Sequence, residues 1–597
     1  STWPPPQTSR SITPVPRLRP HQPIFQIDKI VGSIAPGNTP PAAPMVLVYD
    51  TTLLGGGSGL TVGFYLGSPN LDIDWGDGSA LETASTSGSY THDYASEGTY
   101  NVELIPNGPS ALAAFRAGAG EAGQVMLEGV TSWGDLTPSN LTDAFNGCSN
   151  LTAMAALTTS PTNLERAFAS IGSAAIDLSG WDVSAVTNMN STFYAATGGA
   201  LGISAWDVAS VTTMRETFSG SGVTDDLSGW DVSSVTDMYH MFDGSFDGTA
   251  TGIEAWNVSS VTNMEGMFAT CEAETALAEI DLTGWDVSSV TTMAHMFEEA
   301  FIGPADLSGW VTSNVTTMAY MFTLCPFDGD VSGWDTSSVT TMESMFAEAQ
   351  FFTGTGVDTW DVSAVANMTS IFQGAIAFVG DVSGWVTSSL TAMTFAFYDA
   401  SLFDGDLSGW DVSAVTNMNS VFGFAESFTG VGVDAWDMTG VTNMGSMFIG
   451  ASAFVGDVSG WDVSAVTDMS GMFREATSFN GDLSTWDTSA VTTMNYMFAG
   501  AVAFTAGNIG GWDVSAVTDV SGVFDGASGF DGSLGGWDVS GVVNAPVFGL
   551  SLMFTNAVAF NRDLSGWCVT AFPTLPALFD TGATAWVLAR PVWGTCP

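Results

Sequence analysis

The sequence predicts a mainly β protein with short helices, in which a solenoid of about eighteen repeats follows a small β-sandwich and an extended N-terminal arm. Three observations predict this class: prolines crowd the start, apolar strand-like runs follow, and tryptophans then recur at steps of mostly 24 to 26 residues. The recurring tryptophans are Trp133, Trp181, Trp206, Trp230, Trp256, Trp285, Trp310, Trp334, Trp360, Trp385, Trp410, Trp436, Trp461, Trp486, Trp512, Trp537 and Trp567. A constant period of this length is typical of stacked structural units.

Residues 1–43 form the predicted arm. They are rich in proline, which fixes the backbone and removes hydrogen-bond donors, so an extended segment is expected rather than a packed domain. Four of the ten basic residues of the chain stand in its first 29 positions, namely Arg10, Arg17, Arg19 and Lys29. The arm can serve as a spacer or as a docking segment for a structural partner, and its positive charge favours docking.

Residues 44–106 form the predicted β-sandwich. Residues 45–49 and 60–66 are apolar runs of strand length, separated by a glycine-rich turn. The motif W-G-D-G-S follows at 75–79, and H-x-Y-x-x-x-G-T-Y-x-V-x-L follows at 92–104. This pair of motifs resembles a polycystic-kidney-disease (PKD) type domain. The resemblance implies an extracellular, immunoglobulin-like β-sandwich that spaces or presents other modules.

Three carboxylates of this module, Asp72, Asp74 and Asp77, are candidate calcium ligands, because calcium binds several oxygen atoms at once. The alternative is that Asp77 and Gly78 form a turn in which the side chain bonds the backbone. The turn is the favoured interpretation, and no cofactor is otherwise expected.

The repeats occupy residues 107–567, and their first units are degenerate. Each unit reads approximately L-S-G-W-D-V-S-x-V-T-x-M-x-x-M-F, followed by a variable stretch. Trp410 and Val412 fall on one face of a predicted short strand. A unit of this length cannot bury its own apolar face, so stacking against identical neighbours is required to close the core.

A short helix is predicted after the strand in each unit. Ser337 is a suitable cap, and Val339, Met342 and Phe346 follow at i, i+3 and i+7 of one another. The methionines and phenylalanines are therefore interpreted as core packing.

The unit at 406–422, D-L-S-G-W-D-V-S-A-V-T-N-M-N-S-V-F, and its many copies resemble the repeats of BspA-type leucine-rich-repeat surface proteins. The resemblance implies a right-handed, leucine-rich-repeat-like solenoid. It also implies a role in cell-surface adhesion, with which that family is associated.

Residues 568–597 form the predicted C-terminal cap. Cys568 and Cys596 both lie in it, and a disulfide between them would close a loop over the exposed end of the stack. The other cysteines, Cys148, Cys271 and Cys325, stand singly in repeats and are interpreted as small buried apolar residues.

Catalytic motifs are absent from the sequence, and an enzyme is not expected. The four histidines are His21, His92, His240 and His295, and none is placed to share a metal or a catalytic task. No nucleophile elbow, P-loop or dinucleotide fingerprint occurs. Repetition itself argues against a catalytic site, which needs one distinctive constellation.

Aspartate follows the tryptophan in most repeats, at Asp182, Asp207, Asp231, Asp286, Asp335, Asp361, Asp411, Asp437, Asp462, Asp487, Asp513 and Asp538. These side chains can accept backbone donors of the next turn, or they can line up as a calcium ladder. Asn257, Val311 and Val386 interrupt the series, which argues against an obligatory metal.

Charge and hydropathy exclude two classes of partner. The formal net charge of -52 repels the phosphates of nucleic acids. No apolar run approaches the length of a membrane span, so membrane insertion is not expected.

The expected function is non-catalytic adhesion or receptor binding at an extracellular or virion surface, with a host-surface glycan or protein as partner. The basic arm and a start without an apolar leader favour a phage fibre, tail or decoration component. The alternatives are a secreted or cell-surface bacterial adhesin and a purely structural sheath or filament protein. The variable stretches after each phenylalanine, such as 194–204 and 269–280, are predicted to carry the binding specificity.

Overall fold

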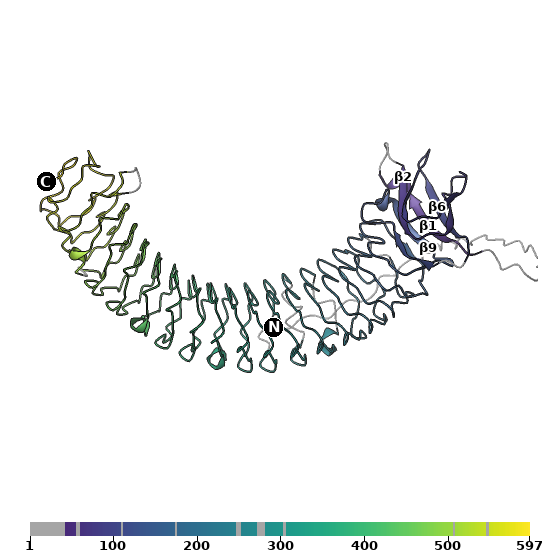
Figure 1. Ribbon diagram of the computed structural model, residues 1–597, viewed down its shortest axis with the longest axis horizontal. Helices are drawn as coiled ribbons and strands as arrows, with labels where there is room; N and C mark the ends of the chain where they lie inside the picture. Colours follow the sequence, from purple (N-terminus) through teal and green to yellow (C-terminus); the bar gives the residue numbers. More distant parts are fainter. Residues whose placement is uncertain are drawn as a thin grey trace, which may run out of the picture. The chain divides into compact units, whose positions relative to one another are not determined.

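The computed structural model describes residues 42–54, 60–108, 111–172, 176–245, 252–271, 281–302, 306–505, 508–544 and 549–597. Residues Ala42–Pro597 form one compact unit, in which consecutive repeat turns lie side by side (Figure 1). The predicted docking residues Arg10, Arg17, Arg19 and Lys29 lie outside the described residues, as does His21.

Regular secondary structure is mainly β, with a few short helices. The strands are β1 (Met45–Asp50), β2 (Thr61–Gly67), β3 (Leu71–Asp74), β4 (Glu82–Ala84), β5 (Gly88–Asp93), β6 (Thr99–Pro106), β7 (Ala111–Leu112), β8 (Ala114–Arg116), β9 (Leu127–Ser132), β10 (Thr137–Pro138) and β11 (Ala153–Met154). The short 3-10 helices are η1 (Thr51–Leu54), η2 (Gln124–Met126), η3 (Ile253–Ala255), η5 (Val357–Thr359), η6 (Val433–Ala435) and η7 (Ile509–Gly511).

Most N-terminal strands form two sheets with a shared apolar core, and β7 pairs with β10 in a third, two-stranded sheet. One sheet has six strands in the order β11-β9-β1-β6-β3-β4, and the other has three in the order β5-β2-β8. Alternate residues of β1 are buried, as the period of two requires. Phe64 of β2 stacks on Trp75 with ring centroids 5.4 Å apart, and both side chains are buried. These contacts join the two sheets across the core.

The six-stranded sheet continues directly into the first repeats. β9 pairs antiparallel with β1, and β11 pairs parallel with β9. Both strands come from the segment after residue 106, where the sequence was expected to leave the sandwich. The predicted boundary between 44–106 and 107–567 therefore does not separate two bodies, because backbone hydrogen bonds cross it.

Successive repeat turns are joined by a ladder of backbone hydrogen bonds along the Met–Phe segment. In one turn, the N–H groups of Met418, Ser420 and Phe422 donate to carbonyls of the following turn over 2.8, 3.0 and 2.9 Å. The N–H of Val421, which lies between Ser420 and Phe422, donates instead to the carbonyl of Met418 in its own turn, over 3.4 Å. Every second donor is thus used between turns.

This pattern shows that the helix predicted after Ser337 was wrong. Ser344 has φ of 52°, and its N–H donates to Thr369 of the next turn over 2.8 Å. An α-helix would instead send every N–H to the residue four positions earlier. The left-handed conformation costs about 1–2 kcal/mol at a residue with a side chain. The inter-turn hydrogen bonds offset that cost, and Met342 and Phe346 still face the core.

The ladder has a direction, because its alternate donors all point toward the following turn. The first turn consequently needs donors for its carbonyl groups. The loop after β8 supplies them: Ala117 donates to the carbonyl of Ala144 over 2.8 Å, and Ala119 donates to Asn146 over 2.8 Å. The N-terminal module therefore covers the carbonyl end of the ladder.

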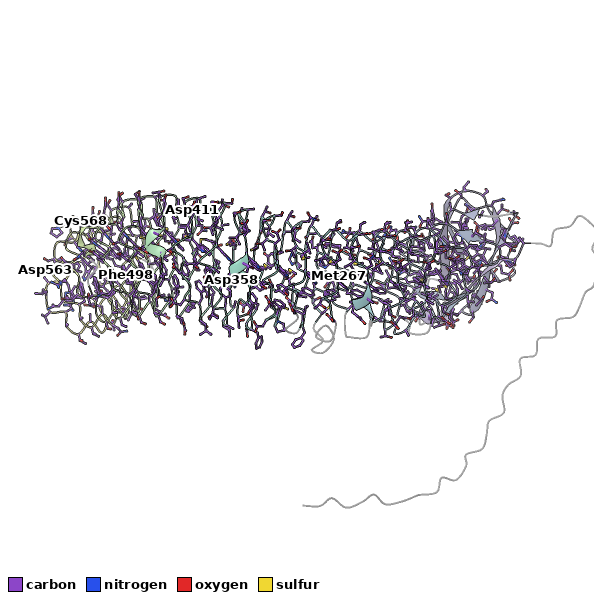
Figure 2. All side chains as sticks on the ribbon, turned by 90° about the horizontal axis from the view of Figure 1, so that it is seen from below. Met267, Asp358, Asp411, Phe498, Asp563 and Cys568 are labelled. Carbon is purple, nitrogen blue, oxygen red and sulfur yellow. A yellow bond between two sulfur atoms is a disulfide. The ribbon has the colours of Figure 1, made fainter. Side chains whose placement is uncertain are left out.

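Two aromatic columns fill the interior of the stack. The phenylalanine that ends each Met–Phe segment stacks on its counterpart in the next turn, as Phe473 does on Phe498 with centroids 5.8 Å apart. The tryptophans form the second column, and from Trp181 to Trp567 each repeat indole N–H donates to a carbonyl of the preceding turn, as Trp410 does to Val382 over 3.1 Å. Phe498 lies within this stack (Figure 2).

A further phenylalanine column begins at Phe327 and was not predicted as a separate feature. Within a turn its rings stack closely on the first column, as Phe346 and Phe352 do with centroids 3.8 Å apart. Cys148, Cys271 and Cys325 are buried in the core of the stack, with 0%, 2% and 1% of each residue exposed. Burial raises the pKa of the Cys325 thiol to about 12.

Candidate binding surface

Two rows of aspartates decorate the repeats and are bonded within their own turns. Asp411 accepts hydrogen bonds from the Ser413 hydroxyl over 2.7 Å and from its N–H over 3.0 Å. In the other row, Asp406 accepts the N–H of Ser408 over 2.9 Å. In both rows the carboxylate accepts a backbone N–H of the turn that follows it. This is the first of the two interpretations of the sequence, in which the aspartates bond backbone donors.

The hydrogen bonds from serine or threonine two residues later lower the pKa of most of these carboxyls. The affected groups are Asp177, Asp226, Asp231, Asp281, Asp286, Asp306, Asp361, Asp381, Asp411, Asp457, Asp462, Asp482, Asp487, Asp513, Asp538 and Asp563.

Changing Ser413 to Ala should raise the pKa of Asp411, because the hydroxyl is the largest cause of its lowering. A folded-state pKa below the unfolded value of about 3.9 stabilises the protein above that pH, and the effect is lost as pH falls through the folded value. A carboxyl NMR titration with labelled aspartate checks the shift. Asp462, whose Ser464 is intact, is the internal control, and an unmoved Asp411 titration in S413A contradicts the prediction.

The three candidate calcium ligands of the N-terminal module each have a separate partner. Asp72 accepts the Thr83 hydroxyl over 2.7 Å, and Asp74 accepts the Gly76 N–H over 2.9 Å. Asp77 accepts the Ser79 N–H and pairs with His92 over 2.8 Å. These contacts, the Ser79 hydrogen bond first, lower the pKa of Asp77 to about 2.

Across the described ranges, no group of three or more His, Cys, Asp or Glu side chains is arranged to hold a metal ion. His240 pairs with Asp243 over 2.9 Å, and His295 pairs with Glu298 over 2.6 Å. Each histidine thus bonds a carboxylate three residues later in its own turn. The Glu298 carboxylate raises the pKa of His295.

Several exposed apolar side chains of the middle repeats lie close in sequence to the second phenylalanine column. This apolar edge consists of Phe351 (63% exposed), Ile376 (40%), Val379 (60%), Leu402 (55%), Val431 (47%) and Val455 (61%). Each lies within three residues of a buried phenylalanine of that column and belongs to one of five consecutive turns. The edge therefore draws its side chains from neighbouring turns.

Buried anchors and inter-turn hydrogen bonds hold this edge in place. Phe352 and Phe378 are fully buried next to the exposed side chains, and their rings lie 6.1 Å apart. The N–H of Val379 donates to the Thr353 carbonyl over 3.1 Å, and that of Val455 donates to Thr429 over 3.1 Å. At Val379 and Val455 the exposed side chains thus project from a backbone that is hydrogen-bonded to the preceding turn.

Carboxylates surround the apolar edge. Asp404 and Glu426 are exposed beside Leu402 and Val431. Burial, and then the Glu426 charge, raises the pKa of Asp399 in the same turns. All six arginines of the described residues already pair with acidic side chains, namely Arg116, Arg166, Arg215, Arg474, Arg562 and Arg590. None of these six arginines is therefore left without an acidic partner.

The edge lies in the stretches after each phenylalanine, where the sequence predicts specificity, but at other units than those singled out. Tyr194 is 43% exposed at the start of one such stretch, whereas 272–280 lies outside the described residues. The signal that marks the edge is the second phenylalanine, five or six residues after the first. In the sequence, an apolar residue next to a buried phenylalanine has the same pattern as a core residue. The exposed residues of the edge therefore could not be distinguished from the core.

None of the helices among the described residues has the length and apolar character needed to cross a membrane. The family described as "Mycoplasma protein of unknown function, DUF285" matches residues 162–279, 221–326, 272–357, 325–431, 425–507 and 505–588. No curated protein and no solved structure matches the chain.

Proposed function

The chain belongs to the Mycoplasma protein family DUF285, and on this premise we propose that it is a surface-displayed, non-catalytic receptor-binding protein. The observation that carries the proposal is the apolar edge. Exposed apolar side chains on five neighbouring turns are unusual on so acidic a body, and such patches mark interaction sites. The partner is a host-surface macromolecule whose apolar centre is rimmed by basic groups.

In this proposal the repeats form a right-handed, leucine-rich-repeat-like solenoid of the BspA type. The N-terminal strands form a PKD-like, immunoglobulin-like module that spaces the repeats from residues 1–43, and those residues attach the protein to a structural partner. The setting is extracellular, on a phage virion as a fibre, tail or decoration component, or on a bacterial surface. The acidic body supports a role without nucleic acid, and the proposal needs neither cofactor nor membrane insertion.

A purely structural sheath or filament is the second candidate. Growth end to end would join the donor end of one ladder to the carbonyl end of another. The carbonyl end is already occupied, since Ala117 and Ala119 donate to Ala144 and Asn146. This capping favours a discrete binding protein over an end-to-end filament.

The triple variant F351S/V379S/L402S should bind a host-surface extract at least about tenfold more weakly, because apolar anchors carry most interface energy. The matched control V311S/L324S/V386S removes side chains that are 53%, 50% and 56% exposed elsewhere on the repeats, and it should bind normally. Retention on immobilised surface extracts of candidate hosts measures both.

Equal losses in both triple variants would contradict a specific edge. Absence of any selective partner across the extracts would favour the structural alternative instead.

A further inference from the structure

One repeat turn, between Trp133 and Trp181, contributes no tryptophan to the aromatic column. The two flanking indoles both donate to the same carbonyl, that of Ala155, over 3.2 Å. Their rings lie 5.9 Å apart but cross at 78°, whereas Trp360 and Trp385 stack at 11°. At the turn that lacks an indole, the column therefore changes from stacked to crossed rings.

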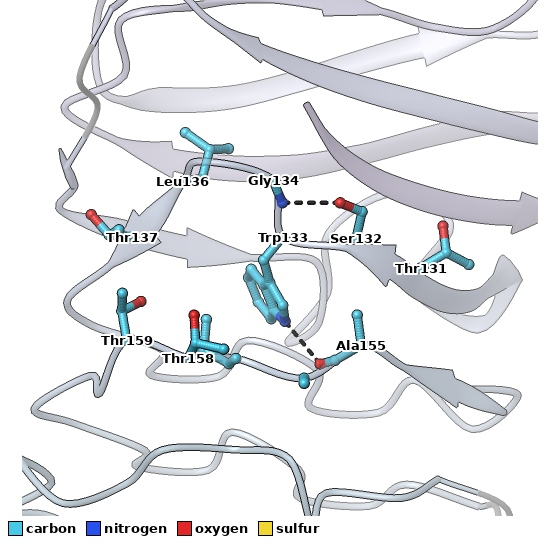
Figure 3. Close-up of a pocket in the computed structure, with 11 residues that line it drawn as sticks. Thr131, Ser132, Trp133, Gly134, Leu136, Thr137, Ala155, Thr158 and Thr159 are labelled. Carbon is cyan, nitrogen blue, oxygen red and sulfur yellow. Dashed lines mark hydrogen bonds between the residues drawn. The ribbon is translucent and has the colours of Figure 1, made fainter. Parts of the chain in front are cut away.

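A pocket of about 330 Å³ lies at this place, between β9, β10 and the segment after β11 (Figure 3). Trp133 and Leu136 supply its apolar wall, and Thr137, Thr158 and Thr159 lie together on one side of the indole ring. The pocket volume is at the lower end of the range of small-ligand sites.

The lining of the pocket carries no charge. Its residues are threonine, serine, glycine, alanine, leucine and tryptophan, in a chain with 62 acidic side chains. Within the described residues, the hydroxyls of Thr131, Thr158 and Thr159 have no hydrogen-bond partner. The pocket thus offers hydroxyl donors and acceptors beside an aromatic ring.

The ring is also held rigidly. Trp133 packs edge-on against Phe115 and Phe145, with centroids 6.1 and 6.3 Å away, and its N–H is used by Ala155. Because packing fixes the rotamer of the Trp133 side chain, this wall of the pocket is preorganised for a ligand.

We propose that this pocket binds one neutral sugar residue of a surface glycan. A sugar presents C–H groups that pack on Trp133 and Leu136, and hydroxyls that match Thr158 and Thr159. A hydrocarbon would leave the threonine hydroxyls unpaired, which costs about 1–3 kcal/mol for each buried group. An anion would be repelled by the acidic body, and a cation would find no carboxylate in the lining. The proposal rests on the receptor-binding function only for the choice of glycans as ligands.

The test is binding of the full chain to an array of neutral, sialylated and sulfated glycans. The wild type should bind neutral glycans that share one terminal sugar. T158W places an indole in the pocket and should lower this binding about tenfold or more. T158A/T159A removes two hydroxyls, should weaken binding several-fold, and keeps the test valid if T158W folds poorly. S540W, an exposed position in a distant repeat, is the control and should bind normally.

Three results would overturn the pocket proposal: no glycan binding by the wild type, preference for acidic glycans, or unchanged binding by T158W and T158A/T159A. The apolar edge is tested separately by retention on host extracts. Loss of glycan binding with intact edge-dependent retention would remove the pocket and leave the receptor-binding proposal standing. Glycan binding by the wild type without edge-dependent retention on host extracts would support the pocket and contradict the role proposed for the apolar edge.

Discussion

Replacing Trp410 with Ala is expected to lower the free energy of unfolding by about 3–5 kcal/mol. Trp410 is only 4% exposed and stacks on Trp385 with centroids 5.8 Å apart. It also contacts Phe397 at 5.8 Å, and its N–H satisfies the Val382 carbonyl. The substitution therefore opens a cavity between turns and leaves a buried acceptor without its donor.

Chemical denaturation followed by tryptophan fluorescence and circular dichroism measures this loss. W410F keeps an aromatic ring but not the N–H donor, so it should fall between W410A and the wild type. V386S changes an exposed residue of the neighbouring turn and is the control. Because stacked repeats interact only with their neighbours, the loss can show as early unfolding of the turns around Trp410. An unchanged unfolding curve for W410A would contradict the role assigned to the column.

Removal of the disulfide between Cys568 and Cys596 is expected to destabilise the C-terminal turns by about 3–4 kcal/mol, as the loop-closure entropy of this span implies. The bond joins residues 28 positions apart, near the C-terminal end of the stack (Figure 2). The loop it closes packs Trp593 against Phe579 with centroids 5.1 Å apart. The disulfide mainly restricts the conformational entropy of the unfolded chain. Its removal therefore stabilises the unfolded state relative to the folded one.

The double variant C568S/C596S, compared with the wild type with and without reductant, measures this effect by thermal and denaturant unfolding. Reductant should destabilise the wild type and leave the double variant unchanged. The buried Cys325, changed to Ser, controls for the remaining thiols. Mass spectrometry that finds both Cys568 and Cys596 as free thiols in the native protein would contradict the pairing.

The position of the core could be predicted from the sequence, because identical units must bury the same side chains against each other. The recurrence of tryptophan and of the Met–Phe segment placed Trp410, Met342 and Phe346 in the interior, where the structure buries them at 4%, 0% and 0% exposure. Where an aspartate follows the tryptophan, as Asp411 does, its predicted hydrogen bond to the residue two positions later likewise forms. Such contacts depend on residues close in sequence, so a single unit contains the information.

The backbone of the Met–Phe segment could not be predicted in this way. Apolar residues at i, i+3 and i+7 suit an α-helix, and they equally suit a turn that donates every second N–H to its neighbour. The choice depends on the acceptors of the next turn, such as the Thr369 carbonyl that receives the Ser344 N–H. A periodic pattern reports which side chains face the core, and not where the backbone donors go.

The sequence by itself determined the period, the burial of the tryptophans and of the Met–Phe segment, and the acidic character of the surface. Only the tertiary structure decided where the apolar edge and the pocket lie, the two surfaces proposed to bind. The apolar edge arises because stacking brings side chains from separate repeats, such as Val379 and Leu402, into adjacent turns. The pocket arises because Trp133 and Trp181, separated by a turn without an indole, converge on one carbonyl. Both depend on contacts between turns, which no single repeat encodes.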